Sequence, residues 1–217
     1  DGIEQHVEKN GVLPSHILSR TFSFLRSNDL IYRPAIKSYM LGETPPAFDL
    51  LYWNGDATGL PGKMTVQYLR WLCQQDQFAQ SGITLFGEVL RLSDVTVPFC
   101  AVACETDHIA AWPDSYRGFT KMGSRSKTFI LSQSGHIGGI INPPSKKKYG
   151  HYTNTAMRLS HNEWQDNAAF HEGSWWSRWE SWLRKKSGKL VPAQQPGSEV
   201  FKPLCAAPGT YVLKGKS

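Results

Sequence analysis

The chain has 217 residues, of which 40% are hydrophobic and 19% charged, and it carries 8 Trp, 8 Tyr and 10 Phe. This length and aromatic content suit a folded chain, with one domain as the first expectation, and exclude an intrinsically disordered one. The formal net charge is +6, but the basic residues are spread out except near 146–148 and 184–189. Solvated surface is therefore favoured over a nucleic-acid-binding patch.

Cysteine usage and hydropathy indicate a reduced, cytosolic protein. The cysteines show no C-x-x-C spacing, no paired His pattern and no secretory context, so reduced thiols are expected. No apolar run approaches the roughly 20 residues of a membrane span. Residues 1–10 do not resemble a signal peptide and the chain does not start with Met, so a fragment or a processed chain is expected. The cysteines are Cys73, Cys100, Cys104 and Cys205.

Helical patterns dominate the first part of the chain. From Ile17 to Met40 apolar residues recur at helical spacing around a break at 27–29, which predicts two short helices joined by a turn. The aromatic-rich stretch 48–56 closes in Asn-Gly and predicts an ordered loop or a short helix. A period of about 3.6 residues predicts an amphipathic helix over 64–78, with Cys73 as a packing residue.

An α/β repeat follows in the middle of the chain. The nearly continuous apolar run 97–104 is typical of a parallel strand covered on both faces. A helix is predicted from Pro113 to Met122, and a second strand from Lys127 to Ser132. Polar residues follow each strand directly, at the position where open α/β sheets bind their ligands.

Shorter elements flank this repeat. Residues 83–92 alternate around Gly87 and predict a strand, a turn and a strand. Helices are predicted over 162–170 and 175–186, the second with tryptophans that pack against the sheet. Residues 191–217 are rich in Pro and predict an extended surface tail. Because only two strands are convincing, the chain by itself is expected to be marginally stable or prone to aggregate.

Asp107 and His136 are the candidate acid and base. Each lies just past a predicted strand, so neighbouring strands would bring a carboxylate and an imidazole together. In a hydrolase triad the imidazole takes a proton from the nucleophile and the carboxylate holds its tautomer. The glycines of 134–139 would let the His loop bend sharply. Local roles stay open, because an Asp in a turn often binds only the backbone, and His108 is a rival base.

The chain contains no nucleophile elbow of the G-x-S-x-G type or its Cys variant. Cys73 falls in a predicted helix, Cys100 and Cys104 fall in a strand, and Cys205 falls in the tail. None of them has the glycine-flanked turn that the elbow requires. The order Asp then His matches the last two members of an α/β-hydrolase triad, so the nucleophile is expected upstream of residue 1.

Six stretches carry a family resemblance through almost the whole chain. They are TFSFLRSNDL at 21–30, FDLLYWNGD at 48–56, DHI at 107–109, SGHIGGIINPP at 134–144, GSWW at 173–176 and APGTYV at 207–212. Together they resemble the polyhydroxyalkanoate synthases, most closely the class that uses short-chain 3-hydroxyacyl-CoA thioesters. The resemblance implies the C-terminal part of an α/β-hydrolase fold with a helical cap, without the N-terminal strands and the nucleophile elbow.

The resemblance also implies site residues. It makes Asp107 the triad acid, His136 the general base and His108 a supporting histidine beside the acid. The family's nucleophile is a Cys in a G-x-C-x-G elbow, which this sequence does not contain. The implied segments are a cap over 1–62, the hydrolase core over 63–190 and a tail over 191–217. Candidates for the cap and the substrate pocket are Phe48, Trp53 and Asp56.

The implied reaction is polymerisation of 3-hydroxyacyl-CoA to polyester with release of CoA, through a Cys-His-Asp triad. No metal or prosthetic group is expected, since a thioester is already activated. Expected partners are the upstream part of the same catalytic domain, the growing polyester, a second copy in a homodimer and the surface of a cytoplasmic polyester granule. Nucleic acid and a membrane span are not expected.

The chain alone is expected to be inactive, because it lacks the nucleophile. Two other interpretations stay open. One is a non-catalytic granule-associated or interaction module derived from a synthase. The other is a fragment of a different α/β-hydrolase, such as an esterase.

Overall fold

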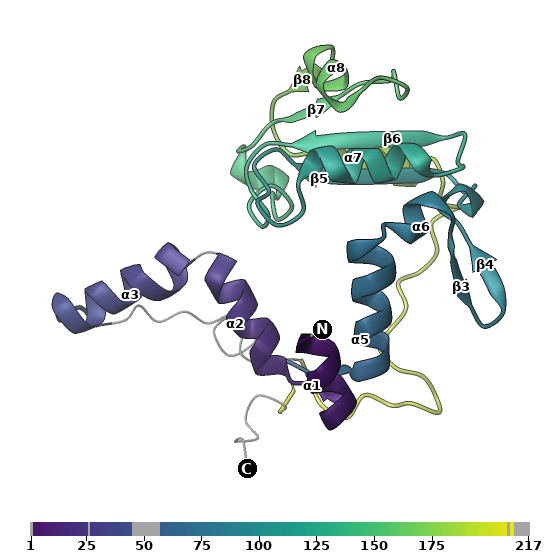
Figure 1. Cartoon of the computed structure of the whole chain (residues 1–217). Coiled ribbons are helices and arrows are strands. Elements are labelled where there is room, and N and C mark those ends of the chain that lie inside the picture. Colours follow the sequence, from purple (N-terminus) through teal and green to yellow (C-terminus); the bar gives the residue numbers. More distant parts are fainter. Residues whose placement is uncertain (1, 26, 45–56, 208, 211–217) are drawn as a thin grey trace. The chain divides into compact units, whose positions relative to one another are not determined.

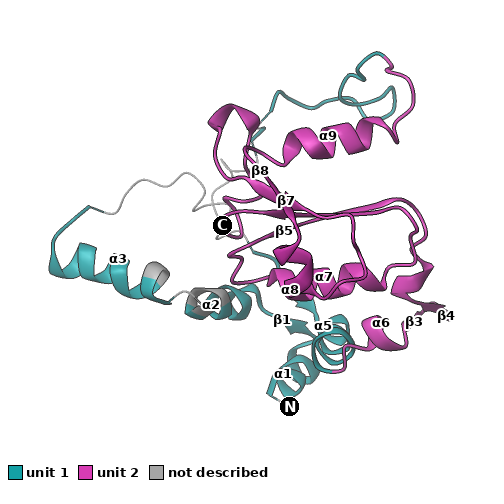
Figure 2. Ribbon diagram, turned by 90° about the horizontal axis from the view of Figure 1, so that it is seen from above, with its two compact units in different colours: residues 1–74, 192–217 teal, residues 75–191 magenta. Residues whose placement is uncertain are grey.

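The computed structural model describes residues 2–25, 27–44, 57–207, 209 and 210 (Figure 1). The described part is mixed α/β with small sheets. The chain divides into two compact units, one of residues 1–74 with 192–217 and one of residues 75–191 (Figure 2). The predicted segments end at residues 62 and 190, and the chain passes from one compact unit to the other after residues 74 and 191.

The first unit is mainly helical. It contains α1 (Gly2–Asn10), β1 (Val12–Leu13), α2 (Ser15–Leu25), α3 (Arg33–Ala35), β2 (Leu60–Pro61) and α5 (Gly62–Tyr68), with π-helical turns at Asn28–Tyr32, Ile36–Met40 and Leu69–Gln74. Helical structure within 17–40 is confirmed, over Ser15–Leu25 and again from Ser27 to Met40, but the predicted turn at 27–29 is wrong, because these residues are helical. The predicted loop or helix over 48–56 lies outside the described residues.

Helices α1 and α5 of the first unit approach each other at Gly62. A Cβ atom at this position would lie 2.1 Å from Cγ1 of Val7 and 2.9 Å from the carbonyl oxygen of Gly11, so no larger residue fits without a shift. The Gly62 N–H donates to the Gly11 carbonyl at 2.9 Å. The helix predicted over 64–78 is shorter than expected, because helical structure ends at Gln74 and Asp76 adopts a left-handed conformation, with φ of 48°.

The second unit contains the predicted α/β repeat. Its elements are α6 (Gln77–Gln80), β3 (Ile83–Leu85), β4 (Glu88–Leu90), β5 (Phe99–Cys104), α7 (Trp112–Lys121), β6 (Lys127–Ser132), β7 (His151–Thr153), α8 (His161–Asp166), β8 (Ala169–His171) and α9 (Trp176–Arg184), with 3₁₀ turns at Leu92–Asp94 and Pro144–Lys146. The predicted hairpin over 83–92 is confirmed, since β3 and β4 pair antiparallel. Its two turn residues, Phe86 and Gly87, have positive φ, as a tight type I′ hairpin requires.

Four strands form the main sheet, in the order β5-β6-β7-β8. Strands β5 and β6 are parallel, with Cys104 opposite Ser132, and the remaining pairs are antiparallel. Strand β6, helix α7 and strand β5 confirm the predicted repeat. The helix predicted over 162–170 is wrong at its end, because α8 stops at Asp166 and Phe170 instead pairs with Tyr152 across β7 and β8. These two short strands extend a sheet that the sequence predicted with only two convincing strands.

The core of the second unit lies between the sheet and α7 and α8 (Figure 1). Successive residues of a strand point to opposite faces, and Phe129 and Leu131 of β6 lie on the face covered by Tyr116 and Trp164. Their neighbours on the opposite face, Ile130 and Ser132, are also fully buried. Strand β6 is therefore covered on both faces, as its apolar sequence indicated.

The part of the tail that the structure describes, residues 192–207, 209 and 210, contains no helix or strand. Several of its apolar side chains, including Val200, Phe201 and Leu204, are exposed. Among the described residues, no helix has the length and apolar character needed to cross a membrane.

Candidate active site

The ends of β5 and β6 bring Asp107 and His136 together, although they are 29 positions apart in the sequence. Because the two strands are parallel and in register, the segments that follow them start side by side. Two further bonds continue this pairing past the strands, from the Glu105 N–H to the Ser132 carbonyl and from the Thr106 N–H to the Ser134 carbonyl. His136 Nδ1 then lies 2.9 Å from Asp107 Oδ2. The expected approach of a carboxylate and an imidazole is thus observed.

The Asp107 carboxylate is fixed and well shielded, with 8% of its side chain exposed. Its Oδ1 accepts hydrogen bonds from the N–H groups of Ile109 and Ala110, each at 2.9 Å. Burial alone would raise the pKa of Asp107, but the bonds from the Ala110 N–H, from His136 and from the Ile109 N–H outweigh it, and the pKa lies below its ordinary value. The carboxylate is therefore charged at neutral pH and accepts the Nδ1 proton of His136.

His136 presents its second ring nitrogen unbonded. Its side chain is 43% exposed, and within the described ranges only Nδ1 makes a hydrogen bond. A proton held on Nδ1 by Asp107 leaves the lone pair on Nε2, which is the tautomer a general base needs. The ring of His108 lies edge-on to that of His136, with centroids 6.4 Å apart. No described carboxylate pairs with His108, so the geometry favours His136 over this rival.

Two tryptophans of the GSWW stretch hold the loop that carries His136. The indole N–H of Trp175 donates to the Gly139 carbonyl at 2.8 Å, and the same oxygen accepts the Ser132 hydroxyl at 2.8 Å. The indole N–H of Trp176 donates to the Ile140 carbonyl at 2.9 Å. The sequence predicted packing for these tryptophans and missed their role as donors, for which the only signal was the GSWW stretch itself.

The glycines of this loop allow it to pack closely against its neighbours, and none of them is needed for an unusual backbone angle. Gly135, Gly138 and Gly139 have no positive φ, and the left-handed position is taken by Ser134, with φ of 74°. A Cβ at Gly139 would lie 2.5 Å from Sγ of Cys104 and 2.7 Å from a backbone oxygen. The predicted sharp bend is therefore made by Ser134, whereas Gly139 lets the loop pack on β5.

Neither cysteine of the second unit, Cys100 or Cys104, has the environment of a reactive nucleophile. Cys104 is almost fully buried, and burial, followed by the negative charge of Asp107, raises the pKa of its thiol to about 11. Burial also raises the pKa of Cys100. Cys73 and Cys205 are exposed, so the prediction that Cys73 is a packing residue of its helix is wrong. A reactive thiol needs a lowered pKa and access, and Cys104 and Cys100 have a raised one.

The cap and pocket candidates Phe48, Trp53 and Asp56 lie outside the described residues. Their position relative to the acid and base pair stays a prediction.

The chain is similar to known proteins along nearly its whole length, although no protein-family model matches it. It is 40% identical over 198 residues to the poly(3-hydroxyalkanoate) polymerase subunit PhaC of Cupriavidus necator, which covers 90% of this chain and 33% of that protein. It is 38% identical over 211 residues to the poly(3-hydroxyalkanoate) polymerase of Methylorubrum extorquens, covering 97% and 35%. Polymerase 2 of Ectopseudomonas oleovorans is 37% identical over 206 residues, covering 94% and 37%.

These relatives define a family of acyltransferases of polyester biosynthesis. The chain belongs to this family, the polyhydroxyalkanoate synthases, as its motifs indicated. It spans about a third of the length of the curated relatives that it matches.

Proposed function

We propose that this chain is the C-terminal part of the catalytic domain of a polyhydroxyalkanoate synthase, and that it supplies the acid and the base of the acyl-transfer reaction. The observation that carries the proposal is the 2.9 Å bond between His136 Nδ1 and Asp107 Oδ2 at the ends of two parallel strands. This arrangement is the one expected of the last two members of an α/β-hydrolase triad. Family membership supports the substrate class, a 3-hydroxyacyl-CoA thioester.

In the proposed reaction, a cysteine thiol from the upstream part of the polypeptide gives its proton to Nε2 of His136. The thiolate attacks the carbonyl carbon of the thioester, and the C–S bond to CoA breaks. The CoA thiolate leaves with the proton of the imidazolium. Asp107 stabilises the imidazolium while it exists, because its charge lies against Nδ1.

Chain growth requires a second transfer. The 3-hydroxyl oxygen of one acyl unit attacks the carbonyl carbon of an enzyme-bound thioester, an ester bond forms, and the enzyme thiol is released with the hydroxyl proton. Asp107 either orients His136 or takes this proton itself. The first role is favoured, because both oxygens of Asp107 are already occupied, Oδ1 by two backbone N–H groups and Oδ2 by His136.

The rest of the assignment follows the family. Residues 1–62 would form the cap over the site, with Phe48, Trp53 and Asp56 near the substrate. Residues 63–190 would belong to the α/β-hydrolase core, and 191–217 to a tail. The complete enzyme would act as a homodimer at the surface of a cytoplasmic polyester granule and would need no metal or prosthetic group.

The proposal is tested by adding the upstream Cys-bearing segment and measuring CoA release from 3-hydroxybutyryl-CoA. The chain alone is expected to release none, and the reconstituted protein to be active. His136→Ala should lower turnover by about 10³-fold or more, as loss of a triad member does. His108→Ala, the matched change at the neighbouring histidine, should have a much smaller effect.

Three results would count against this proposal. Full activity in His136→Ala would exclude His136 as the base, and loss of activity only in His108→Ala would transfer the role to its neighbour. If the intact triad is present and no CoA is released, the chain is better described as a non-catalytic interaction module of the same family.

A further inference from the structure

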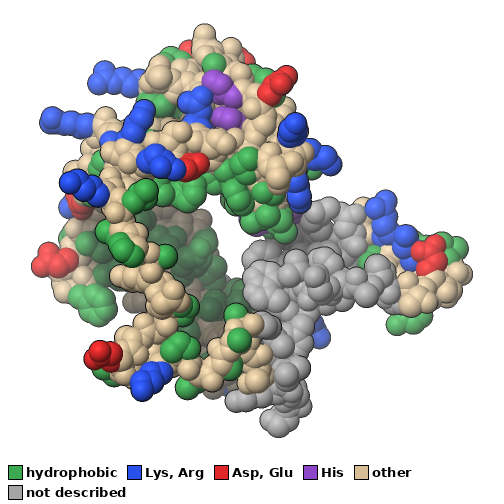
Figure 3. All heavy atoms as spheres, turned by 180° about the vertical axis from the view of Figure 1, so that it is seen from behind, with side chains coloured by type: hydrophobic (Ala, Val, Ile, Leu, Met, Phe, Trp, Pro, Cys, Tyr) green, Lys and Arg blue, Asp and Glu red, His purple; other side chains and the backbone are tan. Residues whose placement is uncertain are grey.

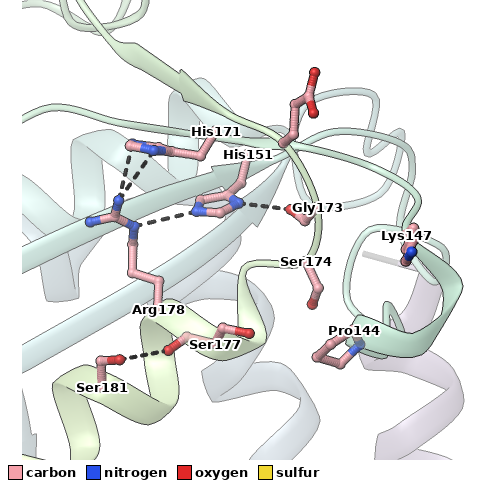
Figure 4. Close-up of a pocket in the computed structure, with 10 residues that line it drawn as sticks. Pro144, Lys147, His151, His171, Gly173, Ser174, Ser177, Arg178 and Ser181 are labelled. Atoms are coloured by element: carbon pink, nitrogen blue, oxygen red, sulfur yellow. Dashed lines mark hydrogen bonds between the residues drawn. The ribbon is translucent and has the colours of Figure 1, made fainter.

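A cavity of about 720 Å³ lies in the second unit, between the turn at 144–147, strands β7 and β8, and helix α9 (Figure 4). This volume is in the range of small-molecule sites. The lining includes three groups that donate hydrogen bonds, Lys147, Ser177 and Arg178, and two imidazoles, those of His151 and His171. Figure 3 also shows histidine side chains at the surface beside Lys or Arg side chains. Nothing in the acyl-transfer reaction uses these residues.

Arg178 is oriented by two imidazole rings. Its Nε donates to Nε2 of His151 at 3.3 Å, and its Nη2 lies 3.0 Å from Nε2 of His171 (Figure 4). The two rings are stacked, with centroids 5.1 Å apart. The Thr153 hydroxyl lies 2.9 Å from the same nitrogen, Nε2 of His171, and helps to fix that ring. The guanidinium is thus held in place before any ligand arrives.

Both imidazoles act as neutral acceptors. Nδ1 of His151 lies 3.0 Å from the Gly173 carbonyl, which only accepts, so Nδ1 carries the proton and Nε2 carries the lone pair that faces Arg178. Burial lowers the pKa of His151, and this effect outweighs the bond to the Gly173 carbonyl, which raises the pKa. The positive charge of Arg178, and that of His171 when it is protonated, lower the pKa of His151 further. Burial and Arg178 also lower the pKa of His171. Each ring is therefore uncharged at neutral pH.

An arginine whose hydrogen-bond acceptors are neutral keeps a positive charge that can bind an anionic ligand. A carboxylate in place of either ring would neutralise the guanidinium, whereas an imidazole only directs it. In the described part of the chain, Arg178 forms no ion pair, and the Nη1 group, the Lys147 ammonium and the Ser177 hydroxyl have no hydrogen-bond partner. Glu172 is the one carboxylate of the lining, so the formal charge there is +2 − 1 = +1.

We propose that this cavity binds a phosphate monoester group, with Arg178 and Lys147 as the charged donors and Ser177 as a neutral one. A phosphate monoester carries about two negative charges and three acceptor oxygens, which match two cations and a hydroxyl. The planar guanidinium can bind two of these oxygens at once. The chemistry is shared by free orthophosphate and by the 3′-phosphate of a CoA nucleotide, and the experiment separates these two sources.

The test is binding of orthophosphate, CoA and 3′-dephospho-CoA to the 217-residue chain by isothermal titration calorimetry at fixed ionic strength, which needs no turnover. Arg178→Gln is expected to weaken orthophosphate binding about tenfold or more. Arg184→Gln removes the same charge from the same helix outside the cavity and should change it less than about twofold. Lys147→Gln and Lys146→Gln form a second pair with the same expected contrast. Tighter binding of CoA than of its dephospho form assigns the phosphate to the nucleotide, and equal binding of both assigns it to the free ion.

A third pair tests the neutral acceptors directly. His171→Gln keeps an uncharged acceptor beside Arg178 and should retain binding within about threefold, whereas His171→Glu supplies a competing carboxylate and should lose about tenfold or more. Circular dichroism confirms that each variant is folded. The proposal is overturned if orthophosphate does not bind, if Arg184→Gln weakens binding as much as Arg178→Gln, or if His171→Glu binds as well as His171→Gln. Because the readout is binding, a failed acyl-transfer assay would leave this result unaffected.

Discussion

Replacing Asp107 by Asn should invert the proton arrangement of His136 while leaving the fold of its turn intact. The amide has the shape of the carboxylate, and its oxygen can still accept the N–H groups of Ile109 and Ala110 that now bind Oδ1. Its NH₂ group then faces His136 Nδ1 at the position of Oδ2. Because this group only donates, Nδ1 must become the acceptor and the proton moves to Nε2. His136 would lose the lone pair that takes a proton from the nucleophile.

The cost in stability follows from the three bonds of the carboxylate. Bonds to a charged group contribute about 1.5–3 kcal/mol and neutral ones about 0.5–1.5 kcal/mol, so each backbone bond to Oδ1 loses about 1 kcal/mol. The bond to His136 adds little, since that ring is 43% exposed. A neutral amide is also easier to bury than a charge. The free energy of unfolding should therefore fall by about 1–2 kcal/mol, while turnover of the reconstituted enzyme should fall by a factor of order 10³–10⁴.

The tautomer is measured by ¹⁵N NMR of the imidazole nitrogens, above the ordinary His pKa of about 6.5, and stability by urea unfolding. In the unmodified chain Nδ1 should be protonated, and in Asp107→Asn Nε2 should be. Asp114→Asn is the control, because this exposed carboxylate of α7 pairs, among the described residues, only with Arg117, and the change should have little effect on stability and none on the tautomer. The reasoning is refuted if His136 keeps its proton on Nδ1 in Asp107→Asn.

Three further outcomes are expected. The pKa of Asp107 is lower in the folded chain than its unfolded value of about 3.9, so this carboxylate stabilises the fold above that pH, and the stabilisation is lost as the pH falls through the folded pKa. Urea unfolding at a series of pH values should therefore show a weaker acid dependence in Asp107→Asn, and identical curves for the two chains would contradict this. Gly139→Ala should lower the free energy of unfolding, since the new Cβ would lie 2.5 Å from Cys104 Sγ. Gly118→Ala, on α7 with no atom within 4 Å of its new Cβ, should raise the free energy of unfolding by up to about 1 kcal/mol, and changes of the same sign in both variants would be inconsistent with this packing. Iodoacetamide should alkylate exposed Cys73 in the native chain and buried Cys104 only after unfolding, so mass spectrometry that finds native Cys104 modified would exclude the described burial.

The strongest local patterns of the sequence predicted the parts of the fold that position the acid and base. The apolar runs of β5 and β6 are long enough to show that both faces are covered, and helix α7 between them starts with Pro113 in its first turn. Two parallel strands so connected must end at the same edge of the sheet. The meeting of Asp107 with His136 could therefore be predicted without coordinates, and the motifs around them identified the family.

Short strands and contacts between residues far apart in the sequence could not be predicted from local patterns. Strands β7 and β8 have three residues each, too few to show alternation, and Phe170 looked helical because its strand partner Tyr152 lies far back in the sequence. The hydrogen bonds that Trp175 and Trp176 donate to the loop of His136 were not predicted either, because the helical spacing of these tryptophans indicated only packing.

The sequence by itself determined which strands bring Asp107 and His136 to one edge of the sheet, because burial leaves a periodic record along the chain. The tertiary structure alone decided the tautomer of His136, the protonated state of Cys104 and the two neutral rings that direct Arg178. Each of these depends on the atoms that surround a side chain, and those atoms come from segments that only the folded chain brings together.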